Sequence, residues 1–139
     1  MAKKKQFLVL ENEIDFILIG IVSNEKDYRL CFDLNKLLEI NLLKGDDLEL
    51  KSKNQESSFF TVSSYANEDG NKMIVISNKS GGKFLVSELK QWDYFFMIKS
   101  FIRETEKLKI IERIKTSKHI ALSAEISPEK VKAIENLIF

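Results

Sequence analysis

The sequence predicts an α+β fold: a two-layer, mostly antiparallel sheet with two main helices on one face and a short C-terminal helical tail. Three observations support this class. The order of expected elements lacks the strict strand–helix alternation of a parallel sheet. An Asp69-Gly70 turn separates two β-rich runs, which is typical of a hairpin. Two further segments have the apolar spacing of amphipathic helices.

The chain has 139 residues, of which 44% are hydrophobic, so it can form one domain with its own core. We expect residues 1–6 to be a mobile basic tail. Residues 7–139 are expected to form a single α+β domain. Its first element, Phe7 to Leu10, is a candidate for a small edge strand.

Ile14 to Val22 is apolar at nearly every position and rich in β-branched residues. This predicts a strand that is covered on both faces, or covered on one face with the other at an interface. Gly20 within it indicates a bulge or a close approach of another group to the backbone. Lys26 to Glu39 predicts a helix with Asn24 as its cap and Asp27 in its first turn. The alternative for this segment is a strand, because Tyr28, Leu30 and Phe32 alternate.

The middle of the chain is β-rich. Leu48 to Lys51 predicts a strand, and Ser57 to Ala66 pairs with Lys72 to Ser77 in the expected hairpin. Asn41 to Asp47 is expected to be a connection and Asn78 to Lys83 a loop.

Tyr94 to Ile98 is apolar on both faces and is predicted to be a central strand. Arg103 to Lys115 predicts a helix whose buried stripe comprises Leu108, Ile110, Ile111 and Ile114. Ile120 to Ile126 alternates as a last strand, and Ser127-Pro128 predicts the start of a short helix. The apolar end, Leu137 to Phe139, is a candidate for docking a partner or a second copy.

Composition limits the possible function classes. The net charge is +1, which argues against general electrostatic attraction to nucleic acid or an anionic membrane. The longest apolar run, Phe16 to Val22, is far shorter than the roughly 20 residues of a membrane span. The single cysteine, Cys31, excludes an intrachain disulfide and fits a reducing compartment. We therefore expect a cytoplasmic protein that does not contact a membrane.

The residue pattern shows no catalytic constellation, metal site or cofactor site. His119 and Cys31 are too few for a zinc site of nitrogen and sulfur ligands, and no nucleophile motif accompanies the histidine. Gly81-Gly82-Lys83 has neither the spacing nor the hydroxyl residue of a phosphate-binding Walker loop. Asp46-Asp47 is predicted to be a solvated turn.

Val86-Ser-Glu-Leu-Lys-Gln-Trp-Asp-Tyr94 resembles the pattern Ile-Pro-Glu-x-x-x-Val-Asp-Tyr that names the small uncharacterised bacterial IPExxxVDY family. Glu88, Asp93 and Tyr94 match in type and spacing, whereas Ser87 replaces proline and Trp92 replaces valine. Three further stretches are similar to the family: Leu18 to Ile21, Asp27 to Asn35 in part, and Glu135 to Phe139. The resemblance implies no activity.

The leading hypothesis is a non-enzymatic interaction or regulatory module that binds an unknown protein partner or a second copy of itself. Trp, Tyr and Arg dominate binding hot spots. The candidate interaction residues are Tyr28, Arg29, Glu88, Trp92, Asp93 and Tyr94. The alternative for Glu88, Asp93 and Tyr94 is a structural corner, in which the carboxylates cap backbone N–H groups or pair with Arg29 or Arg103.

A second hypothesis is a single-stranded RNA-binding domain in which hairpin aromatics stack on bases and lysines contact phosphates. Its candidate residues are Lys3, Lys4, Lys5, Phe59, Tyr65 and Lys72. A third is an enzyme of unfamiliar type, which predicts a pocket with convergent polar groups and shifted pKa values.

Overall fold

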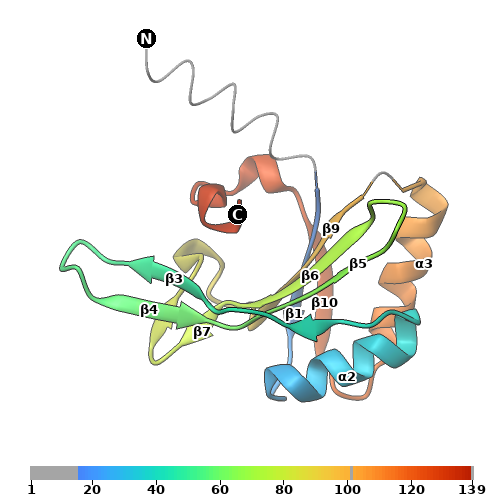
Figure 1. Cartoon of the computed structure of the whole chain (residues 1–139), viewed down its shortest axis with the longest axis horizontal. Coiled ribbons are helices and arrows are strands. Elements are labelled where there is room, and N and C mark those ends of the chain that lie inside the picture. Colours follow the sequence, from blue (N-terminus) through green and yellow to red (C-terminus); the bar gives the residue numbers. More distant parts are fainter. Residues whose placement is uncertain (1–15, 101, 139) are drawn as a thin grey trace, which may run out of the picture.

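The computed structural model describes residues 16–100 and 102–138 and confirms the predicted α+β class (Figure 1). The predicted basic tail and the candidate strand at residues 7–10 lie outside these residues. Every strand pair is antiparallel. The main sheet has six strands, in the spatial order β10 (Leu122–Ile126), β1 (Ile17–Val22), β9 (Tyr94–Lys99), β6 (Lys72–Ser77), β5 (Val62–Ala66) and β2 (Leu43–Lys44).

The two faces of this sheet carry separate hydrophobic clusters, because alternate side chains of a strand point to opposite faces. Ile19, Phe96 and Val75 belong to the face that we call the helix face. Leu18, Phe95 and Ile76 belong to the opposite face, called the tail face. As predicted, β9 is central, lies between β1 and β6, and is almost entirely buried.

Two helices, α2 (Asp27–Leu38) and α3 (Glu104–Lys115), cover the helix face, as predicted (Figure 1). The helical interpretation of the α2 segment is therefore confirmed over the alternating-strand alternative. The predicted Asn24 cap is wrong: Lys26 occupies the cap position and makes no side-chain cap bond. The predicted buried stripe of α3 is wrong at Leu108, which is half exposed, whereas Ile114 is fully buried.

The predicted strand at residues 57–66 is interrupted at Thr61, and its two halves pair with different partners. β4 (Ser57–Phe60) pairs with β3 (Leu48–Lys51) in a separate hairpin, while β5 pairs with β6 across the predicted turn. The N–H of Thr61 donates to the Ser77 hydroxyl at 3.0 Å, and the N–H of Ser77 donates back to the Thr61 carbonyl. These two hydrogen bonds fix the backbone at Thr61, where the chain leaves its pairing with β3 and begins its pairing with β6.

Two predicted connections contain short strands. β2 lies within the expected connection at residues 41–47. β7 (Lys79–Ser80) and β8 (Lys83–Phe84) form a small hairpin around the Gly81-Gly82 turn. Both glycines have positive φ, at +51° and +80°, which a glycine adopts without steric cost. In Figure 1 the β3–β4 hairpin extends away from the main sheet.

The C-terminal segment folds onto the tail face in two 3₁₀ turns, Pro128–Lys130 and Ile134–Leu137. Val131, Ile134 and Leu137 are buried in the same cluster as Leu18 and Phe95. The prediction that Leu137 belongs to a free docking tail is therefore corrected, because its side chain packs against the chain's own sheet. Within the residues that the structure describes, no helix has the length and apolar character to span a membrane.

Candidate functional site

A buried corner surrounds the segment that resembles the family motif. Its centre is Asn78, whose side chain is fully buried between β6 and β7. The Asn78 side-chain amide donates to the carbonyl oxygens of Leu89 and Trp92 at 2.9 and 3.0 Å, and its side-chain oxygen accepts from the Val86 N–H at 2.8 Å. One side chain thus satisfies three backbone groups of residues 86–92. From the sequence, Asn78 was predicted only to be the first residue of a loop.

Trp92 is 7% exposed and lies flat against Gly20 of β1. A Cβ at residue 20 would lie 2.3 Å from Cδ2 of Trp92. The close approach that Gly20 predicted is therefore confirmed, and the approaching group is the indole ring.

Asp93 joins β9 to the entry of α2. One carboxylate oxygen accepts from the Ser23 N–H at 2.9 Å, and the other pairs with Nζ of Lys79 at 2.6 Å. Its backbone N–H donates to the Ile21 carbonyl at 2.8 Å. These contacts set the path into the helix in place of the predicted cap.

The Tyr94 hydroxyl donates to the Glu25 carbonyl at 2.6 Å. Burial, together with the nearby Asp27 and Asp93 carboxylates, raises the pKa of the Tyr94 phenol to about 12. The phenol therefore stays a hydrogen-bond donor throughout the neutral pH range.

Glu88 connects the corner to the C-terminal segment. Its side chain accepts from the Ala133 N–H at 2.7 Å, and Asn136 donates to the Leu85 carbonyl at 2.8 Å nearby. The carboxylates of Glu88 and Asp93 thus bind backbone N–H groups, as the structural alternative predicts. Among the described residues, neither Arg29 nor Arg103 pairs with them; the cation beside Asp93 is Lys79.

The six candidate interaction residues do not form one exposed surface. Trp92 and Tyr94 belong to the core, whereas Tyr28 and Arg29 lie exposed on α2.

Two aromatic side chains lie exposed on α2. The side chain of Tyr28 is 68% exposed, and that of Phe32, one turn further along the helix, is 56% exposed. The Lys36 ammonium lies 4.7 Å from the centre of the Phe32 ring. We call Tyr28, Arg29, Phe32 and Lys36 the α2 aromatic face. Phe32 was not among the predicted interaction residues, because these were taken from the start of the helix and from the segment that resembles the family motif.

The described candidates for RNA stacking lie in different environments. Phe59 is half exposed on β4, whereas Tyr65 packs partly against the helix-face cluster. Lys72 is exposed at the end of β6, opposite Lys99 of β9. Lys3, Lys4 and Lys5 lie outside the described residues, so the role of the basic tail stays a prediction.

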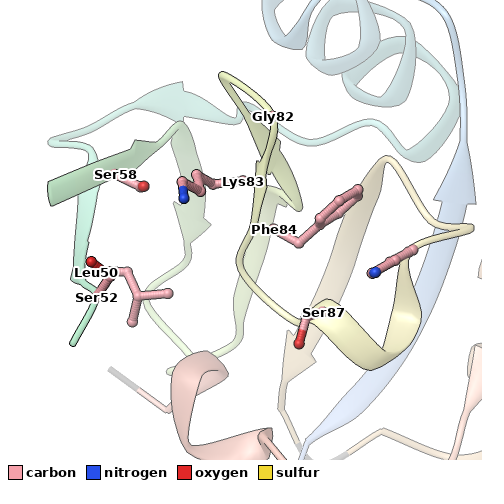
Figure 2. Close-up of a pocket in the computed structure, with 8 residues that line it drawn as sticks. Leu50, Ser52, Ser58, Gly82, Lys83, Phe84 and Ser87 are labelled. Carbon is pink, nitrogen blue, oxygen red and sulfur yellow. The ribbon is translucent and has the colours of Figure 1, made fainter. Parts of the chain in front are cut away.

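A groove of about 350 Å³ opens between the β3–β4 and β7–β8 hairpins (Figure 2). Leu50 and Phe84 are its apolar lining residues. Figure 2 shows the Lys83 side chain extending across it toward Ser58. The remaining lining residues are Ser52, Gly82, Ser87 and Lys90. The groove was not predicted from the sequence, because it lies between two hairpins that are distant along the chain.

The other candidate reactive groups lie elsewhere. Cys31 lies on the buried side of α2, where burial raises the pKa of its thiol. Nδ1 of His119 lies 3.1 Å from the Glu25 carboxylate. Within residues 16–100 and 102–138, no three His, Cys, Asp or Glu side chains are grouped closely enough to hold a metal ion.

The structure thus defines an α+β protein with one six-stranded antiparallel sheet, a buried polar corner, an exposed aromatic helix face and a groove lined by lysine and serine. A scan against protein-family models and a search of curated proteins found no match to the chain. The resemblance to the IPExxxVDY family stays a prediction from the motif.

Proposed function

We propose that the protein is a non-enzymatic interaction module that binds a different protein through the α2 aromatic face. The observation that carries the proposal is the exposure of Tyr28 and Phe32 one helical turn apart. Each large ring buries a considerable apolar area when a partner covers it, and aromatic residues with Arg are enriched at binding hot spots.

The charges of this face favour a partner over a second copy. Arg29 and Lys36 are its charged members and both are positive. The acidic residues of α2 are engaged elsewhere: Asp27 pairs with Lys44 at 3.7 Å, and Asp33 accepts from the Ser117 hydroxyl. Two copies meeting through this face would bring like charges together, so an apolar surface bordered by carboxylates is the expected partner.

The test is recovery of partners from native lysate by the tagged protein and by the double variant Tyr28→Ala/Phe32→Ala. We expect the double variant to lose a defined partner. Leu108→Ala is the matched control, because Leu108 is also half exposed on a helix but lies on α3. Equal recovery by all three stable proteins would contradict the proposal.

Size measurement by light scattering separates the partner from self-association. We expect the purified protein to be monomeric, with or without the two α2 substitutions. A dimer that the double variant abolishes would assign the α2 aromatic face to a second copy instead and contradict the choice of partner.

A further inference from the structure

The two edges of the main sheet differ in how far they are open to another strand. One edge is β2, which is only two residues long. The other edge is β10, which pairs with β1 at five consecutive positions. Within the described residues, no strand pairs with the outer side of β10. The backbone N–H and C=O groups along that side can therefore pair with a further strand.

β10 lacks the usual features that keep an edge strand from pairing. Prolines, lysines and bulges serve this purpose in many sheets, and none of them occurs in Leu122–Ile126. Its single charged side chain, Glu125, is paired with the Lys107 ammonium at 3.3 Å. The chain that follows β10 turns onto the tail face, where Val131 is buried. The C-terminal segment thus leaves the outer edge of β10 open.

Ser123 of β10 gives a second, independent indication that a segment lies along this edge. Its side chain is 5% exposed, and its Oγ is the one buried side-chain oxygen or nitrogen without a hydrogen-bond partner in the described parts of the chain. A buried hydroxyl without a partner costs free energy, and most such groups are bonded in folded proteins. A segment beside β10 would bring further polar groups to this position.

The part of the chain that can reach this edge is the part that precedes β1. The described chain begins at Phe16, and Leu18 lies opposite Ile126, so the preceding residues enter at the C-terminal end of β10. The outer side of β10 lies about two strand spacings, roughly 10 Å, from β1. Residues 11–15 can span up to about 17 Å. Phe7 to Leu10, the apolar run predicted to be a small edge strand, is therefore within reach.

We infer that Phe7-Leu-Val-Leu10 docks as a further strand on the outer edge of β10. The short connection to β1 makes this segment run antiparallel to β1 and therefore parallel to β10, with Leu10 at the Ile126 end. All four side chains are apolar, so either alternate pair suits the position beside Ala124 and Ile126, which are partly buried against the tail-face cluster. The docking does not involve α2 and does not depend on the function proposed there.

The test measures nuclear Overhauser contacts and amide hydrogen exchange in the full chain. We expect contacts between residues 7–10 and Leu122–Ile126. We also expect the paired amides of residues 7–10 to exchange at least about tenfold more slowly than in an unstructured chain. Contacts of residues 7–10 with another surface, or exchange at the unstructured rate, would overturn the inference. A dimer in light scattering whose contacts join β10 to β10 of a second copy would also overturn it.

The variant Leu8→Pro/Val9→Pro tests the pairing from the side of β10. Neighbouring N–H groups of a strand point to opposite sides, so one of the two prolines removes a donor that faces β10. We expect exchange at least about tenfold faster at the β10 amides that point away from β1, while the amides of β9 keep their rates.

Lys4→Pro/Lys5→Pro is the matched control, because it places two prolines in the same terminal segment but outside the apolar run. We expect it to leave the exchange rates of β10 unchanged. If the two double variants have the same effect on β10, residues 7–10 are not the strand that covers this edge.

Discussion

Asn78 shows how much of this fold depends on one polar side chain. It has no exposed surface, and it binds the backbone of the segment that leads into β9 through both its side-chain oxygen and its side-chain nitrogen. A buried amide is stable only when its hydrogen bonds are satisfied, and removal of the side chain would leave several backbone groups unpaired. Nothing in the sequence near Asn78 distinguishes it from other loop asparagines, since its partners are set by tertiary structure.

Gly20→Ala should destabilise the protein by about 1–3 kcal/mol, the usual range for overpacking a core. The new Cβ would lie 2.3 Å from the Trp92 indole, and the indole is too deeply buried to move aside. Urea unfolding measures the change. Gly45→Ala is the control, because the nearest atom to its new Cβ is 4.0 Å away. Equal stability of the two variants would contradict the close packing of Trp92 on β1.

The raised pKa of Tyr94 predicts a loss of stability at alkaline pH. The pKa is about 12 in the folded protein and about 10 in an unfolded chain, so the folded state favours the protonated phenol. The difference in pKa therefore contributes to the free energy of unfolding. This contribution is fully present below pH 10, is lost as the pH rises from about 10 to 12, and amounts to at most about 2–3 kcal/mol.

Tyr94→Phe should therefore reduce the decline in unfolding free energy across this alkaline range. It should also cost about 1 kcal/mol at neutral pH through the lost bond to the Glu25 carbonyl. Tyr28→Phe, at an exposed position, is the control. An alkaline decline that Tyr94→Phe leaves unchanged would show that another group causes it.

Hydrophobic periodicity correctly predicts those helices and strands in which contacts with near neighbours along the chain decide which side is buried. Leu30, Leu34, Leu37 and Leu38 of α2 recur at helical spacing; three of them are buried, and Leu37 is partly buried. Leu108 has equally suitable spacing, yet it is exposed because α3 covers the sheet only with its other side. The break at Thr61 was not predictable from alternation, because it results from pairing with β3 on one side and β6 on the other.

The C-terminal segment is predicted to be part of the core. Leu137→Ala should cost about 2–5 kcal/mol, the range for a truncated buried leucine, because Leu137 is fully buried against the tail face. Leu122→Ala is the control at a half-exposed position of β10 and should cost much less. Thermal and urea unfolding measure both. A small effect of Leu137→Ala would mean that the segment does not cover the sheet in solution.

At the scale of the whole molecule, the sequence was sufficient to predict the fold class, the central position of β9 and the hairpin between β5 and β6. It was not sufficient to predict the functional surfaces. Trp92 and Phe32 are both large aromatic residues that are followed by an aspartate, but the first is buried and the second is half exposed. Their difference depends on which residues of distant segments lie against them, as Gly20 does against Trp92.

The buried polar corner and the α2 aromatic face have separate proposed roles, the first in stability and the second in binding a partner. The most direct test of this division measures unfolding free energy and partner recovery on the same two variants, Asn78→Ala and Tyr28→Ala/Phe32→Ala. We expect Asn78→Ala to lose about 3 kcal/mol of stability while each folded molecule still binds the partner. We expect the α2 variant to keep its stability within about 0.5 kcal/mol and to lose the partner. If the stable α2 variant still recovers the partner, or if folded Asn78→Ala does not, the division of roles is wrong.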